Sequence, residues 1–317
     1  MKKFILASLA LMAASVWADA QFVITPKTGT PVQMSGNISF SPNADKTAWS
    51  VGESYDATLD VSQIESISLG SGDDEAAKVG DFFYSDGTWS TDLDASKTPI
   101  GVVFYVGNTA EHDAALRAAH PGCVHGLVVG LKEKKCEWQD YYTDFDEEVG
   151  MTVGEWIEDN TDYVSISTRS FSMESVFNQI MGYNNTCGID EFNDGEYGWD
   201  YEVIIGSTLS SQTSDIKAPE TTSGWYIPSI KEVSLLCSGD LGKNIDDLGY
   251  DDTPDNANAV LINSRLAQIA GAVELSGVYW SSTEYSATQA NSVQFNKGLV
   301  MQTSKGGSNI LRPVLAF

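Results

Sequence analysis

The fold is decided by the C-terminal part of the chain, which opens with Val278-Tyr279-Trp280-Ser281-Ser282-Thr283-Glu284-Tyr285. Polar and apolar residues then alternate from Asn291 to Asn296, and Asn296-Lys297-Gly298 is typical of a hairpin turn. After a second turn at Lys305-Gly306-Gly307, the sequence ends in the apolar run Val314-Leu315-Ala316-Phe317. The pattern predicts an antiparallel meander. We expect its last strand to be held in a sheet, because an apolar tail in water is unfavourable.

Further motifs lie upstream. Gly224-Trp225-Tyr226-Ile227-Pro228-Ser229 precedes Glu232, and two strand-like runs extend from Val79 to Trp89 and from Pro99 to Phe104. With Tyr279–Glu284, Val293-x-Phe295-x-x-Gly298 and Arg312-Pro313-Val314, these motifs resemble the C-type-lectin-like domain that ends bacterial Lcl-type collagen-like adhesins. Ile227 and Val233 replace the leucines that are commoner in that family. The resemblance implies an α+β, C-type-lectin-like domain over residues 79–317.

Several residues of these motifs are expected to be structural. Ser229 and Glu232 form a capping box, in which a hydroxyl and a carboxylate bond the free N–H groups at a helix start. Aromatic residues in such motifs usually bury their large area. Arg312 is expected to be partly buried and to need a carboxylate partner such as Glu284 or Glu232. The structural set is Trp225, Pro228, Ser229, Glu232, Trp280 and Arg312.

The N-terminus has the pattern of a secretory signal. Lys2-Lys3 precedes an apolar run from Phe4 to Val16, and Ala18-Asp19-Ala20 is an A-x-A cleavage site. Residues 1–20 are therefore predicted to be a signal peptide, and the protein to be exported: periplasmic, secreted or associated with the cell surface. The apolar run is too short to span a bilayer, and none later in the sequence is long enough.

The composition is strongly acidic. Lys and Arg number 18 against 44 Asp and Glu, a formal net charge of −26. Such a charge repels nucleic acids and anionic membranes. It suits solvated acidic loops, which we favour, and also basic partners or divalent cations.

The four cysteines are Cys123, Cys136, Cys187 and Cys237. In an exported chain an even number allows disulfides, with three possible pairings, and buried free thiols are the alternative. Cys123 and Cys136 flank an apolar strand-like run, so they could pair only if the chain reverses near Lys132-Glu133-Lys134.

Two units are predicted in the mature chain. Residues 21–69 have strand character, as in the alternating run Ile64–Leu69, and are expected to form a small β unit. Residues 70–78 begin with the acidic Gly-rich run Gly70-Ser71-Gly72-Asp73-Asp74-Glu75 and are predicted to be a linker. Residues 79–317 form the larger domain. Its helices are expected at 111–119, at 172–181 with Gly182 as the stop, from Ser229 onward and at 257–270, with a long loop from Asp190 to Glu202.

No metal or cofactor is favoured. His120, Cys123 and His125 lie close in sequence but lack a partner motif for zinc. The acidic runs Asp190–Glu196 and Asp246–Asp252 could bind Ca²⁺ through oxygen ligands, but Phe192 occupies a position where an EF-hand needs an oxygen. Ca²⁺ is possible but not favoured, and we predict no cofactor.

Polar side chains on the meander and its turns are the candidate ligand-binding set. Amides with an aromatic ring suit the recognition of a sugar or a peptide, although they also suit an ordinary exposed edge. The set is Glu284, Tyr285, Gln289, Asn291, Asn296, Lys297, Gln302 and Lys305.

The sequence is therefore interpreted as an exported, non-catalytic binding or adhesion module for an extracellular glycan or protein ligand. It has only three histidines and no recognisable catalytic triad or phosphate loop, which argues against an enzyme. An enzyme related to the formylglycine-generating superfamily is the alternative, because the fold is similar. Those enzymes use a close pair of cysteines late in the chain, where this one has none after Cys237. A structural subunit of a surface assembly, docked through its N-terminal β unit, is a third reading.

Overall fold

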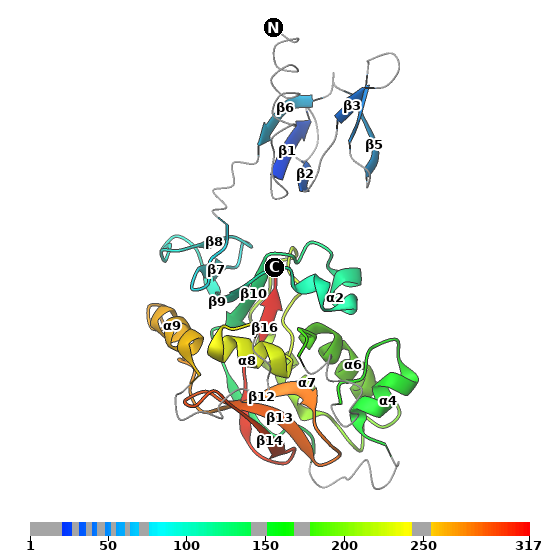
Figure 1. Ribbon diagram of the computed structural model, residues 1–317, viewed down its shortest axis with the longest axis vertical. Helices are drawn as coiled ribbons and strands as arrows, with labels where there is room; N and C mark the ends of the chain where they lie inside the picture. The colour runs from blue at the N-terminus through cyan, green and yellow to red at the C-terminus, as the bar shows by residue number, and fades with distance from the viewer. Residues whose placement is uncertain are drawn as a thin grey trace. The chain divides into compact units, whose positions relative to one another are not determined.

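The computed structural model divides the chain into two compact units, residues 1–75 and residues 76–317 (Figure 1). It describes the strand backbones between residues 21 and 69 in the first unit, and residues 76–140, 151–167, 178–242 and 255–317 in the second. The predicted signal peptide, residues 1–20, and most of the predicted linker, residues 70–78, lie outside the described residues. Both stay predictions.

The described part of the first unit is all β. Its strands form two three-stranded sheets, in the orders β2-β1-β6 and β3-β4-β5. The first and last strands are antiparallel neighbours, with Phe22 paired to Leu69. The strands are β1 (Gln21–Pro26), β2 (Val32–Ser35), β3 (Phe40–Pro42), β4 (Ala48–Val51), β5 (Tyr55–Asp60) and β6 (Ile64–Leu69).

The second unit begins with a five-stranded sheet in the order β16-β10-β9-β7-β8. Its strand β9 is buried on both faces, with Val102 in one hydrophobic cluster and Val103 in another, which explains its continuous apolar sequence. The C-terminal strand pairs with β10 at Leu127 and Ala316, so the prediction that it is held in a sheet is confirmed. The strands are β7 (Phe82–Tyr84), β8 (Trp89–Ser90), β9 (Pro99–Val106), β10 (Gly126–Gly130) and β16 (Val314–Ala316).

The predicted meander belongs to a second sheet, in the order β11-β15-β12-β13-β14. Only β12, β13 and β14 follow one another as a meander, and Gly298 takes the positive φ of 68° that their second turn requires. The prediction of a single meander was therefore wrong for the last two strands, β15 and β16. β15 lies on the other side of β12, where Ile310 pairs in parallel with Tyr279, and β16 joins the first sheet. The strands are β11 (Lys134–Cys136), β12 (Val278–Glu284), β13 (Gln289–Gln294), β14 (Leu299–Ser304) and β15 (Asn309–Leu311).

Helices pack around and between the sheets. The capping box of Ser229 and Glu232 is confirmed at the start of α8, which packs against β9 of the first sheet and against β12 and β13 of the second (Figure 1). The helices are α2 (Ala114–Ala119) after the short 3-10 helix η2 (Thr109–Glu111), α4 (Val153–Asn160), α6 (Gly182–Asp194), α7 (Ile204–Thr213), α8 (Ile230–Ser238) and α9 (Ala257–Leu266). The unit is thus mixed α+β.

Two helix predictions are corrected. Gly182 begins α6 instead of ending a helix, and α6 runs through Asp194, where a loop was expected. A Cβ at Gly182 would collide with the Glu232 carboxylate, so this glycine permits close packing and does not act as a stop signal. Residues 172–177 of the predicted helix at 172–181 lie outside the described residues.

Two buried tryptophans join the halves of the second sheet. The Trp138 indole N–H donates to the Ser281 carbonyl, and the Trp280 indole N–H donates to the Cys136 carbonyl, both at 2.9 Å. Both side chains are fully buried, so each satisfies its one polar atom on a carbonyl within two residues of the other tryptophan. Trp225 is only half-buried, and its indole N–H donates to the Ile216 carbonyl. None of the described helices is long and apolar enough to cross a membrane.

Candidate binding groove

Three of the eight predicted ligand-binding residues are not on the surface. Glu284 and Asn291 are fully buried, and Lys305 is 4% exposed, so their assignment to a ligand site was wrong. Lys305 Nζ donates to Glu284 Oε1 at 2.5 Å and to Gln139 Oε1 at 2.9 Å. The Asn291 amide donates to the Thr283 carbonyl. These residues hold the meander to the rest of the unit.

The Glu284 carboxylate also caps a helix. It accepts hydrogen bonds from the backbone N–H groups of Val153 and Gly154, in the first turn of α4. An anion at this position satisfies free N–H groups and complements the helix dipole. The Lys305 ammonium lies 4.7 Å from the centre of the Trp138 ring, which adds a cation–π contact. This cluster is structural.

The other five predicted residues are distributed along the hairpins. Tyr285 and Gln289 lie at the turn between β12 and β13, whereas Asn296 and Lys297 lie at the turn between β13 and β14. At about 3.3 Å per residue, β13 separates the two turns by about 20 Å. Gln302 pairs with Asn291 in the middle of β14. The five therefore do not form one site.

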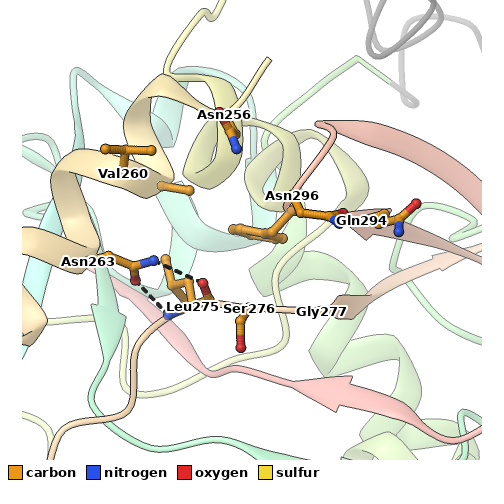
Figure 2. A pocket seen from close by; sticks show the side chains of 10 residues that line it. Asn256, Val260, Asn263, Leu275, Ser276, Gly277, Gln294 and Asn296 are labelled. Carbon is orange, nitrogen blue, oxygen red and sulfur yellow. Dashed lines mark hydrogen bonds between the residues drawn. The ribbon is translucent and has the colours of Figure 1, made fainter. Parts of the chain in front are cut away.

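Asn296 is the predicted residue that lines a groove. The groove has a volume of about 410 Å³ and lies between α9, the segment before β12 and the end of β13 (Figure 2). The Asn263 side chain fixes one wall, because its amide donates to the Leu275 carbonyl and its oxygen accepts from the Leu275 N–H. The lining residues are Asn256, Ala259, Val260, Asn263, Leu275, Ser276, Gly277, Gln294, Phe295 and Asn296.

The lining is neutral. None of the described residues that line the groove is ionisable at neutral pH, so the groove offers no general acid or base. The amides of Asn256, Gln294 and Asn296 make no side-chain hydrogen bond within the described part of the chain, and Val260 is 62% exposed beside them. Amides of this kind can each donate and accept. The groove therefore suits the binding of a neutral polar ligand.

Pro228, Ser229 and Glu232, which belong to the structural set predicted from the sequence, are all buried. Pro228 is buried, and the Glu232 carboxylate accepts hydrogen bonds from the Tyr226 hydroxyl and the Ser229 N–H. Complete burial raises the pKa of Glu232 to about 7, against the lowering effect of these bonds. The carboxyl group is therefore partly protonated at neutral pH.

Arg312 has a different partner from those predicted. It is 1% exposed and pairs with Glu133 at 3.1 Å, not with Glu284 or Glu232. It also donates to the carbonyls of Gly130 and Val273. Burial lowers the pKa of the Arg312 guanidinium. Glu133 was missed because it stands between two lysines in what the sequence presents as a charged turn.

All four cysteines are free thiols. Burial raises the pKa of Cys123 to about 11 and of Cys237 to about 12, and it also raises the pKa of Cys136 and Cys187. A thiol whose pKa is raised above its usual value is protonated at neutral pH and is a weak nucleophile. This chemistry does not favour the alternative of a cysteine-dependent enzyme.

The suspected metal ligands have other roles. His120 Nε2 lies 3.1 Å from the Tyr183 hydroxyl, and the His125 ring packs between Trp89 and Phe317. Within the described ranges, no group of three or more His, Cys, Asp or Glu residues is placed to hold a metal ion. The second acidic run, residues 246–252, lies outside these ranges.

Comparison with known proteins gives one similar protein and one solved structure of similar fold, and no family model matches. A Bacteroides ovatus protein, named provisionally as fimbrium tip subunit Fim1C, is 27% identical over 245 residues, covering 69% of this chain and 41% of that protein. A crystal structure of a fimbrial protein from Bacteroides ovatus has a TM-score of 0.58 at 23% identity, covering 76% of this chain and 49% of that one.

The chain thus spans less than half the length of either of these two chains. The structural likeness shows a mixed α+β fold shared with a protein that is named as fimbrial. The C-type-lectin-like part of the predicted fold stays a prediction.

Proposed function

We propose that this protein is an exported subunit of a surface fimbria and acts there as a non-catalytic adhesion module. The observation that carries the proposal is the 27% identity over 245 residues with a protein named as a fimbrium tip subunit. The fold shared with a crystal structure of a protein named as fimbrial supports it. The partners would be other subunits of the assembly and an extracellular glycan or protein ligand.

The neutral groove supplies a surface for that ligand. Asn256, Gln294 and Asn296 can each donate and accept hydrogen bonds, and Val260 adds an apolar contact. Hydroxyl groups of a sugar and amide groups of a peptide both match this set.

The place of the protein in the cell tests the proposal. Antibodies raised against residues 76–317 would be used for immunogold electron microscopy of the source bacterium and for blotting of sheared fimbriae. We expect label on fimbriae and a band in the sheared fraction. Protein found only in the periplasm or free in the medium would contradict the proposal.

Array binding tests the groove. The purified chain would be applied to immobilised glycans and peptides, in parallel with Asn296→Ala, Val260→Asp and the control Lys297→Ala, which changes an exposed neighbour outside the lining. Binding lost in the first two variants and kept in the control would locate the ligand in the groove. Equal binding by all four proteins would place the ligand elsewhere.

A further inference from the structure

A second pocket lies where α6 ends and α7 begins, and it shares no residue with the groove. Its volume is about 620 Å³, within the range of about 300–1,000 Å³ that is usual for small-ligand sites. None of the eight predicted ligand-binding residues belongs to it, but Asp190, Asn193 and Asp194 come from the acidic run that was considered for Ca²⁺. The lining residues are Asp190, Asn193, Asp194, Gly198, Trp199, Glu202, Gly206, Ser207 and Ser210.

Trp199 is highly exposed to solvent at this pocket. Its side chain is 94% exposed, although a tryptophan normally buries about 150–250 Å² on folding. The loop that carries it is anchored on both sides. The Asn193 side chain bonds both the N–H and the carbonyl of Val203, and Gly198 packs so closely on the Asn193 backbone that a Cβ there would collide with it. Val203 and Tyr201 are buried. The indole is therefore presented outward by a fixed loop.

The polar groups of the pocket are mainly acceptors. The carboxylates of Asp190, Asp194 and Glu202 make no hydrogen bond or ion pair through their side chains within the described residues. The hydroxyls of Ser207 and Ser210 donate to helix carbonyls, so their free lone pairs can only accept. The ligand that fits must therefore carry several donors.

The positions of the Asp190 and Asp194 carboxylates are electrostatically unfavourable. Asp190 and Asp194 are four residues apart on α6, so they face each other at the C-terminal end of the helix. The last turn of α6 has no basic residue, and the helix dipole disfavours negative charge there. Desolvation, together with the charges of Asp194 and Glu191, raises the pKa of Asp190 to about 6. Hydrogen bonds donated by a ligand would relieve this repulsion.

We propose that the Trp199 pocket binds a neutral glycan, with the C–H face of one sugar ring stacked on the indole and ring hydroxyls donating to Asp190, Asp194 and Glu202. The proposal rests on the proposed adhesive function and adds a glycan site that is separate from the groove. A metal ion does not fit, because no group of metal-ligating residues is present in the described ranges. A single ammonium group is a compact point charge, whereas the acceptors here lie on α6, on the loop and at the start of α7.

Named disaccharides test the pocket. Lactose, maltose, cellobiose and N,N′-diacetylchitobiose would be added at millimolar concentration to the full mature chain, with binding followed by saturation-transfer NMR and calorimetry. We expect at least one to bind. Trp199→Ala should weaken that binding tenfold or more and Asp194→Asn several-fold. Tyr285→Ala, which removes another exposed aromatic that does not line the pocket, should leave it unchanged. Circular dichroism and melting temperature confirm that each variant is folded.

Three results would overturn the proposal. One is the absence of binding by all four sugars, and another is binding that survives Trp199→Ala. The third is capture of a lysine-rich peptide in place of sugar, at low salt and not at high salt, which would identify a basic partner. Failure here is distinct from failure of the proposed function. Protein found in fimbriae without sugar binding contradicts only the pocket, and sugar binding by a protein absent from fimbriae contradicts only the fimbrial role.

Discussion

The Lys305 ammonium group lies 2.5 Å from the Glu284 carboxylate, and both side chains are buried. This pair joins three parts of the second unit: the end of β12, the turn after β14 and the N-terminus of α4. Gln139 Oε1 accepts a second hydrogen bond from the lysine. A buried ion pair of this kind depends on its other hydrogen bonds, since desolvation opposes it.

Breaking the pair from one side should destabilise the protein strongly. Glu284→Gln or Lys305→Met leaves an uncompensated buried charge, which costs about 3–5 kcal/mol of unfolding free energy. Urea denaturation measures this loss, with the exposed Lys297→Ala as the control. The double variant should be less destabilised than the sum of the two single variants. A Lys305→Met protein as stable as wild type would show that the pair contributes nothing.

Local signals in the sequence located many of the elements. The capping box at Ser229 and Glu232 predicted the start of α8, and the strand-like run from Pro99 to Phe104 predicted most of β9. A second capping box, formed by Thr152 and Glu155, begins α4 and can be recognised in the sequence by the same rule. The acidic and aromatic residues around it have no clear period, so the sequence predicts no helix there.

The site depended on contacts that no local pattern contains. Glu284, Asn291 and Lys305 have polar side chains on hairpins, which in sequence indicates solvent exposure, but α4 and Gln139 cover them. The groove likewise combines Asn296 with residues of α9 that are distant in sequence. The exposure of Trp199 was also unpredictable, because a tryptophan among aromatic residues is more often buried.

The Glu232 carboxyl group makes stability fall as pH rises. Its pKa is about 7 in the folded state against 4.5 for an ordinary glutamate, so between these values the folded protein holds a proton that the unfolded chain has lost. The contribution of this proton to the unfolding free energy is complete below pH 4.5 and is lost as pH rises through 7. Its size is on the order of 3 kcal/mol.

Glu232→Gln should therefore flatten the pH dependence of the unfolding free energy between pH 4.5 and 7. The amide can still bond Tyr226 and the Ser229 N–H in one of its orientations. Denaturation at a series of pH values measures the slope. Glu220→Gln, whose side chain is 90% exposed, is the matched control. An unchanged slope in Glu232→Gln would contradict the assignment.

The buried thiols should resist modification. Cys123 and Cys237 are each 1% exposed, with pKa values raised to about 11 and about 12, so native protein should not expose a reactive thiolate at either position. Titration with a disulfide reagent at mildly alkaline pH should label them only after denaturation. Mass spectrometry of the labelled peptides identifies each site. Rapid native labelling of Cys237 would show that its surroundings are open.

Substitutions at Trp280 and Tyr285 should have very different effects on stability, because one residue is in the core and the other is on the surface. Trp280 is fully buried and bonded to the Cys136 carbonyl, so Trp280→Ala should cost about 3–5 kcal/mol. Tyr285 is 40% exposed on the next turn, and Tyr285→Ala should leave the melting temperature nearly unchanged. Equal melting temperatures for the two variants would contradict this assignment of core and surface.

Limited proteolysis should cut the chain first between Gly70 and Lys78. This segment begins with small and acidic residues that bury little apolar area, so it can enter a protease site more easily than a packed strand. The division between the two compact units falls at Glu75 and Ala76, inside the same segment. The expected product is a resistant fragment close to residues 79–317, identified by intact mass.

A protease of broad specificity is needed because Lys78 is the only basic residue in the segment from Gly70 to Lys78. Replacing Gly70-Ser71-Gly72 with three prolines should slow cleavage at this site, because proline restricts the backbone and is accepted poorly by most proteases. First cuts within residues 224–317 would contradict both the boundary and the stability of the second unit.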